Sequence, residues 1–203
     1  MARKLIVLFD GTWNNKKSRT NVIRMREAIA SSGPDDREQP CFYDPGVGTR
    51  WYDKITGGAF GQGLSENIRQ GYRWLAQKYQ ANDGIYVFGF SRGAYTARSL
   101  VGLIRKCGIL KSADESRVER AYDLYRDKSV APDDPKAVAF RASESREARV
   151  RFIGVWDTVG VASTLGALDT RYRLSLSVWM MSWPLACKLI LLCSLPPRAL
   201  MKT

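Results

Sequence analysis

The stretch IYVFGFSRGAYTARSL, residues 85–100, constrains the fold more than any other part of the chain. A continuous apolar run comes first, and apolar residues recur at helical spacing after it, which predicts a buried strand followed by a helix. Between them, residues 89–93 match the pattern G-x-S-x-G, in which the serine stands at a sharp turn from strand to helix. Side chains in place of Gly89 or Gly93 are expected to clash there. The context predicts a nucleophile elbow with Ser91 at its apex, and a plain glycine-rich turn is the alternative.

Other apolar runs predict the rest of a sheet. Residues 4–9 (KLIVLF) form a continuous apolar run, residues 40–49 contain a short second strand, and residues 150–156 (VRFIGVW) form another strand after a polar, proline-containing loop. Helical periodicity separates these runs: one helix is expected with Asn21 as its cap, and another is expected to begin at Ser65 after a glycine-rich loop. Alternating strands and helices predict an α/β fold with a mostly parallel sheet and helices on both faces.

Polar groups follow several of these predicted strands. Asp157 closes the strand at 150–156 and comes after the serine, as the acid of a Ser-Asp-His triad does, although it could simply cap a turn. The backbone N–H of Arg92 is expected to face a developing oxyanion from the start of the helix. A second oxyanion donor is expected from the loop after the first strand, at Gly11 or Thr12. Asp10 either orients that loop or holds an ordinary turn.

Six blocks of the sequence, in order, resemble the α/β-hydrolase domain of type VI secretion phospholipase effectors and their uncharacterised relatives: LFDGTWN, TNVIRM, YDPGVGT, GLSENIRQGYRWL, IYVFGFSRGAYTARSL and FIGVWDTVG. The resemblance covers about residues 3–160. It implies an α/β-hydrolase core that cleaves lipid or phospholipid esters through an acyl-serine intermediate. By position it makes Ser91 the nucleophile and Asp157 the acid.

The chain contains no histidine, although a serine hydroxyl needs a base to become nucleophilic at neutral pH. In the resembling family, a block that carries the histidine follows the aspartate block. Losing that histidine costs on the order of 10⁶ in turnover. We therefore expect residues 1–160 to be a C-terminally truncated hydrolase domain that is inactive as this chain alone, unless a downstream fragment supplies a histidine. The alternative is a non-catalytic, degenerate hydrolase that binds a lipid surface or a protein partner.

Residues 161–203 form a hydrophobic tail in which the composition changes abruptly. We favour a shifted reading frame as its origin. A membrane segment over residues 174–195 is a second interpretation, because the run is long enough to span and arginines flank it. A buried terminal helix is the third.

The formal net charge of +12 allows an anionic partner. Because the arginines are dispersed and no nucleic-acid-binding motif occurs, we do not expect a nucleic acid, whereas an anionic membrane surface stays open. The chemistry of an elbow implies no cofactor. No metal is expected, since the cysteines form no C-x-x-C pair; the alternative is a hard cation held by Asp10, Asp44 and Asp157.

The first residues carry a basic start and an apolar run that is shorter than the apolar region of a secretory signal. We therefore expect a protein that is cytoplasmic as synthesised. Type VI export, or membrane association through residues 174–195, are the alternatives.

Overall fold

A computed structural model describes residues 3–11, 19–32, 38–46, 59–156, 158 and 189–192. Five strands of these residues form one sheet in the order β2-β1-β3-β6-β7. The strands are β1 (Lys4–Phe9), β2 (Cys41–Asp44), β3 (Gly84–Phe90), β6 (Val150–Trp156) and β7 (Leu189–Leu192). The first four in this order run parallel to their neighbours, and β7 pairs antiparallel with β6. The prediction of a mostly parallel α/β sheet is confirmed.

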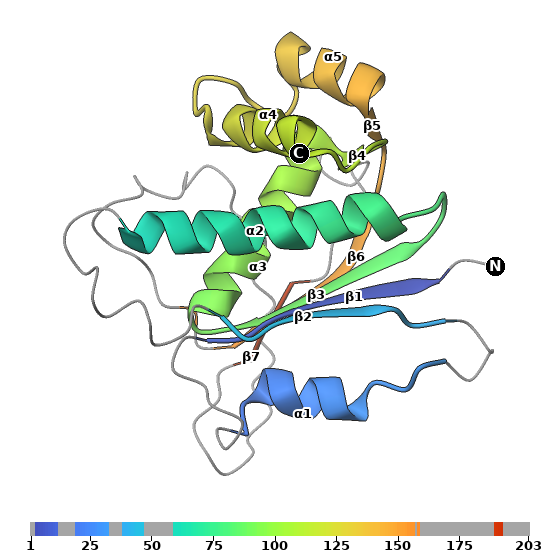
Figure 1. Cartoon of the computed structure of the whole chain (residues 1–203), viewed down its shortest axis with the longest axis vertical. Coiled ribbons are helices and arrows are strands. Elements are labelled where there is room, and N and C mark those ends of the chain that lie inside the picture. Colours follow the sequence, from blue (N-terminus) through green and yellow to red (C-terminus); the bar gives the residue numbers. More distant parts are fainter. Residues whose placement is uncertain are drawn as a thin grey trace, which may run out of the picture.

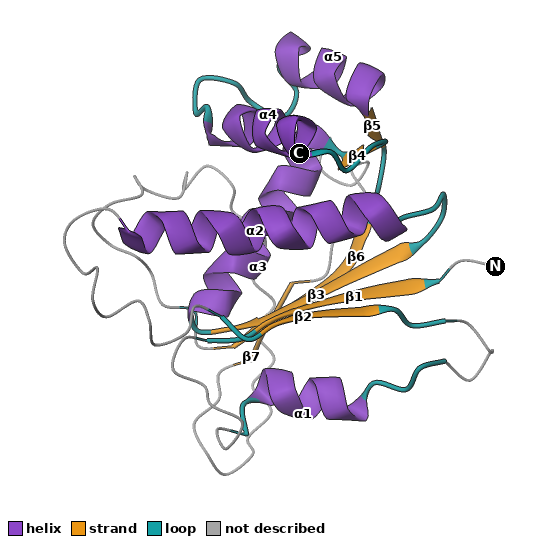
Figure 2. Ribbon diagram, viewed as in Figure 1, coloured by secondary structure: helices purple, strands orange, loops and turns teal. Residues whose placement is uncertain are grey.

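Helices cover both faces of the sheet (Figures 1 and 2). Helices α2 (Ala59–Lys78) and α3 (Arg92–Cys107) lie on one face, and α1 (Asn21–Ala28) lies on the other. Beyond α3 lie α4 (Glu115–Arg126), α5 (Pro135–Glu144) and a ribbon of β4 (Ile109–Leu110) and β5 (Ser145–Arg146).

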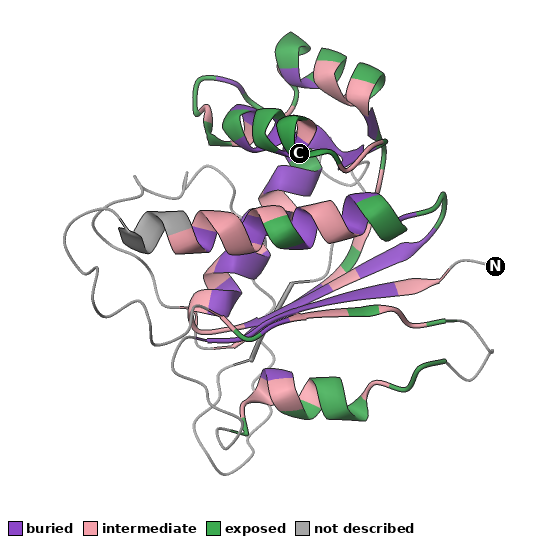
Figure 3. Cartoon of the chain, viewed as in Figure 1, coloured by how far each residue is buried: buried purple, intermediate pink, exposed green. Residues whose placement is uncertain are grey.

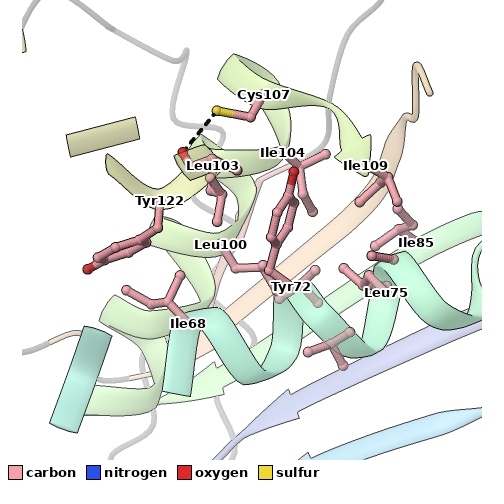
Figure 4. Packing of buried hydrophobic residues seen from close by; sticks show 14 of the residues in the cluster. Ile68, Tyr72, Leu75, Ile85, Leu100, Leu103, Ile104, Cys107, Ile109 and Tyr122 are labelled. Atoms are coloured by element: carbon pink, nitrogen blue, oxygen red, sulfur yellow. Dashed lines mark hydrogen bonds between the residues drawn. The ribbon is translucent and has the colours of Figure 1, made fainter. Parts of the chain in front are cut away.

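The main core lies between the sheet and the α2–α3 pair. Figure 3 shows β1 and β3 buried along most of their length, as continuous apolar strands covered on both faces must be. Within this core, the fully buried Tyr72 lies beside Leu100 and Ile104 (Figure 4), and its hydroxyl donates to the Gly108 carbonyl over 2.9 Å. Burying one such apolar side chain stabilises the fold by about 1.5–3 kcal/mol.

A smaller apolar cluster joins α1 to the opposite face. Val22 of α1 is fully buried against Ile6, Leu8 and Phe88 of the sheet. The Phe88 ring also stacks on Trp156 of β6, with 6.1 Å between the ring centroids. This cluster fixes α1 against the sheet.

Three local predictions were wrong. The cap of α1 is Thr20, not Asn21, because the Thr20 hydroxyl accepts the Ile23 N–H at 3.1 Å. Helix α2 begins at Ala59, six residues before the predicted Ser65, so the glycine-rich stretch is partly helical. Helix α5 occupies part of the predicted loop before β6, and Asp134 caps it by accepting the Lys136 N–H at 2.8 Å.

The tail predictions fall mostly outside the described residues. Of residues 174–195, the structure describes only Leu189–Leu192, and these four residues form strand β7 rather than part of a helix. Their continuous apolar sequence suits a strand beside β6. Among the described helices, none has the length and apolar character needed to span a membrane.

An ion pair fixes the amino-terminal end of the two central strands. Arg3, just before β1, donates from its guanidinium to Asp83 Oδ2 over 2.7 Å and from its backbone N–H to Asp83 Oδ1 over 3.0 Å. Burial opposes ionisation of Asp83, but the hydrogen bonds from Arg3 and from the Gln80 N–H outweigh it, so the pKa of Asp83 lies below its ordinary value of 3.8. The ionised carboxylate therefore stabilises the folded state.

We expect Asp83→Asn to lower the free energy of unfolding at pH 7 by about 1–3 kcal/mol, because it removes a charged acceptor from a buried site. The carboxylate's contribution is present above the pKa of the unfolded chain and is lost as the pH falls through the lower pKa of the folded state. Urea denaturation between pH 7 and pH 3 should show the difference from wild type shrinking below about pH 4. Asp133→Asn, at an exposed position, is the control, and an equal effect of both variants would contradict the assignment.

Candidate active site

The carboxyl ends of the parallel strands lie at one edge of the sheet. The order in which strands are added to the sheet reverses at β1: the chain passes from β1 to β2 on one side and then returns to β3 on the other side of β1. In α/β sheets a crevice forms outside the strand ends at such a switch point. Here that point lies between the end of β1, followed by Asp10 and Gly11, and the end of β3, followed by Ser91.

Ser91 occupies the turn between β3 and α3. Its backbone has φ +54° and ψ −116°, a conformation that side-chain-bearing residues rarely adopt. Three backbone hydrogen bonds hold it there: its N–H donates to the Trp156 carbonyl over 2.9 Å, and its carbonyl accepts the N–H groups of Ala94 at 3.0 Å and Tyr95 at 3.4 Å. The Ser91 side chain makes no capping bond to α3. Because Ser91 directly precedes the sixteen-residue helix α3, its hydroxyl lies at the amino end of that helix, where the helix dipole favours negative charge.

The glycines on either side of Ser91 are required by close backbone contacts. A Cβ on Gly89 would lie 2.3 Å from the Gly93 carbonyl oxygen, and one on Gly93 would lie 2.2 Å from the Phe9 carbonyl oxygen. Neither neighbour is a flexible side-chain end that could move aside. The turn thus packs directly on the end of β1, and Arg92 lies between the two constrained positions, in the first turn of α3.

Asp10 organises the loop that leaves β1. Asp10 is only 2% exposed, although aspartate is rarely buried in proteins. Oδ1 accepts the Gly11 N–H at 2.7 Å, and Oδ2 accepts the hydroxyls of Thr20 at 2.8 Å and Tyr43 at 3.1 Å. The Gly11 N–H is therefore already used in a hydrogen bond to Asp10. Thr12, the other predicted oxyanion donor, keeps that role as a prediction and lies outside the described residues.

Asp157, the predicted acid, also lies outside the described residues. The residue before it, Trp156, pairs in the sheet with Phe90, the residue before Ser91. Strands β3 and β6 thus end side by side at the positions that precede the two predicted triad members. The role of Asp157 stays a prediction.

Asp44 ends β2 at the same edge of the sheet. It is 7% exposed, and its Oδ1 accepts the Gly46 N–H at 2.7 Å. Its Oδ2 is buried and has no hydrogen-bond partner among the described residues. Burial, and to a smaller degree the charge of Asp10, raise the pKa of the Asp44 carboxyl. In the part of the chain that the structure describes, no three acidic, cysteine or histidine side chains gather to hold a metal ion. The alternative of a hard cation also involves Asp157 and stays untested.

Sequence reasoning missed the partners of Asp10. The sequence pattern indicates only that Thr20 precedes a helix and that Tyr43 lies in a strand. The one available signal is the parallel pairing of β1 with β2, which places Tyr43 opposite Leu8, two residues before Asp10.

The chain is similar to known proteins over most of its length. A family model described as "T6SS, Phospholipase effector Tle1-like, catalytic domain" matches residues 3–183, and so continues past residue 160 into the stretch where the sequence alone showed no counterpart. An uncharacterized protein of Saccharomyces cerevisiae is 29% identical over 189 residues, a match that covers 80% of this chain and 27% of the yeast protein. The chain therefore spans about a quarter of that relative's length. No solved structure matches.

We expect Gly93→Ala to lower the free energy of unfolding by about 3 kcal/mol or more, because its Cβ would overlap backbone atoms and overpacking alone costs about 1–3 kcal/mol. Gly102→Ala, in the same helix, is the matched control. Its Cβ would meet only the ring edge of Tyr125 at 3.1 Å, and alanine favours the helix by about 1 kcal/mol. Urea denaturation of both variants measures the difference, and a Gly93→Ala protein as stable as the control would disprove the tight contact with β1.

Proposed function

The chain belongs to the Tle1-like phospholipase effectors of type VI secretion systems, within the catalytic domain of that family, and we propose that it carries the nucleophile of a serine lipid esterase. The family points to lipase or phospholipase activity. The observation that carries the proposal for this chain is the turn at Ser91, whose serine adopts positive φ between a strand and a helix. Strained conformations of this kind concentrate at functional sites.

In the proposed reaction, Ser91 Oγ attacks the acyl carbonyl of a phospholipid or another lipid ester. A bond forms between Oγ and the acyl carbon, the bond to the leaving alcohol oxygen breaks, and the serine proton passes through a base to that alcohol. Water then hydrolyses the acyl-serine by the same route in reverse. The backbone N–H groups of Arg92 and Thr12 stabilise the oxyanion, and Asp157 orients the base.

The base itself is not among these 203 residues, since none of them is a histidine. We propose that it comes from a further segment or a separate chain. The much greater length of the yeast relative supports this arrangement. Without the base, the loss is on the order of 10⁶ in turnover, which leaves about 10³–10⁴ over water from oxyanion stabilisation and binding. The 203-residue chain alone is therefore a nearly inactive enzyme.

The second candidate is a non-catalytic relative that binds an anionic lipid surface or a protein partner. The absence of histidine and the net charge of +12 favour it, since basic surfaces are attracted to anionic headgroups. For both candidate functions, we propose that the full protein is exported, because the family consists of secretion-system effectors. Residues 1–160 remain our proposed limits of the hydrolase domain.

Added imidazole should restore measurable ester hydrolysis, because it replaces the missing base. We expect it to raise the rate of p-nitrophenyl butyrate hydrolysis by the wild-type chain about ten- to a hundredfold above that of Ser91→Ala at the same imidazole concentration. Ser143→Ala, at an exposed serine on α5, should behave as wild type.

Mass spectrometry of the quenched reaction should locate one butyryl group on the peptide that contains Ser91. Equal rates for wild type and Ser91→Ala at every imidazole concentration, with no acylated peptide, would exclude the nucleophile. Rapid phospholipid hydrolysis by the purified chain without imidazole would instead overturn the claim that it lacks its base.

A further inference from the structure

Asp10 and Gly11, which directly follow β1, are held by polar contacts. Asp10 is nearly fully buried, and its carboxylate oxygens accept hydrogen bonds from Gly11, Thr20 and Tyr43. Burying a carboxylate is costly unless donors satisfy it. These donors come from three elements: the loop itself, the cap of α1, and β2.

The backbone around Asp10 is also enclosed from two sides. A Cβ on Gly93 would lie 2.7 Å from the Asp10 carbonyl oxygen, and a Cβ on Gly46 would lie 2.9 Å from the carbonyl oxygens of both Asp10 and Gly11. Asp10 and Gly11 are therefore fixed between the Ser91 turn and the turn after β2. In addition, the Asp10 N–H donates to the Asp44 carbonyl over 2.9 Å.

We propose that Asp10 is a positioning residue for oxyanion stabilisation: its carboxylate fixes the Asp10–Gly11 backbone beside the Ser91 turn, and this backbone leads into the proposed oxyanion donor. This inference rests on the proposed function, because it concerns the same site. Asp10 touches neither the substrate nor the reacting atoms. It acts through the loop, and Thr20 and Tyr43 hold Asp10.

The Tyr43 hydroxyl is a dependable donor in this arrangement. Burial, together with the charge of Asp10 and its hydrogen bond, raises the pKa of Tyr43 to about 12. The phenol therefore keeps its proton throughout the neutral range and donates to Asp10 Oδ2. The guanidinium of Arg26 lies over the Tyr43 ring, 4.4 Å from the centroid, and holds the ring in place.

The test compares Asp10→Asn and Tyr43→Phe with wild type in imidazole-supported ester hydrolysis. An amide at position 10 keeps only one acceptor atom, so it cannot accept the Gly11 N–H together with the Thr20 and Tyr43 hydroxyls. Phenylalanine at 43 removes one donor while keeping the ring. Misplacing an oxyanion donor lowers transition-state stabilisation, so kcat should fall about 10–100-fold for Asp10→Asn and about 3–10-fold for Tyr43→Phe, with KM within about twofold.

Asp83→Asn is the matched control. It also replaces a buried carboxylate, but Asp83 lies at the opposite end of the central strands, where it accepts hydrogen bonds from Arg3 and Gln80. Its kcat should stay within about twofold of wild type. A purely structural role for Asp10 would lower stability and leave kcat per folded molecule unchanged, and that result would overturn the proposal.

Hydrogen exchange tests the Asp10 proposal without a measurement of enzyme activity. Asp10→Asn and Tyr43→Phe should speed amide exchange in the peptide that covers residues 9–12, relative to Asp83→Asn. If Ser91→Ala hydrolyses the ester as wild type does, the proposed function fails and the catalytic role of Asp10 fails with it. If Ser91→Ala is inactive while both loop variants keep wild-type kcat and exchange, only the Asp10 proposal is overturned. Should Asp10→Asn not fold, the milder Tyr43→Phe decides alone.

Discussion

The proposed site depends on one contact between two backbones, in which the start of α3 lies directly on the end of β1. The space for a side chain at Gly93 is already filled by the Phe9 carbonyl. The contact is possible because β1 and β3 pair in register along their whole length, from Lys4 opposite Gly84 to Phe9 opposite Gly89. The buried face of α3 then anchors the helix in the main core. Core packing thus brings the Ser91 turn and the β1 loop within touching distance.

The elements that sequence reasoning found are those with a local physical signature. Strands β1, β3 and β6 consist of apolar residues apart from Lys4 and Arg151, and the turn after β3 needs two glycines four residues apart. Helix α5 was missed because its apolar face is weak, although Asp134 followed by Pro135 is a good helix start. The early start of α2 was missed because its glycines suggested a loop. Each glycine costs about 1 kcal/mol in a helix, and a twenty-residue helix packed on the sheet tolerates that cost.

The site could be predicted only where its residues are close in sequence. Ser91 and its flanking glycines form a single motif, so their arrangement followed from the sequence. Asp10 and Tyr43 lie 33 residues apart, and their hydrogen bond depends on the register between β1 and β2. The bond from the Gly11 N–H to Asp10 Oδ1 depends on the backbone conformation of one turn. No spacing rule predicts either bond.

The strained backbone of Ser91 is a feature that concentrates at functional sites. The close contacts of Gly89 and Gly93 impose this turn from the surrounding structure. Asp10 is more informative. An apolar side chain could fill its site without the cost of burying a charge, whereas a buried carboxylate with three donors fixes a loop beside the turn. Oxyanion stabilisation by fixed dipoles does not depend on which group accepts the serine proton. In the proposed esterase, the Ser91 turn and the Asp10–Gly11 backbone are therefore already in place, and the proton acceptor is the part that we propose comes from outside these 203 residues.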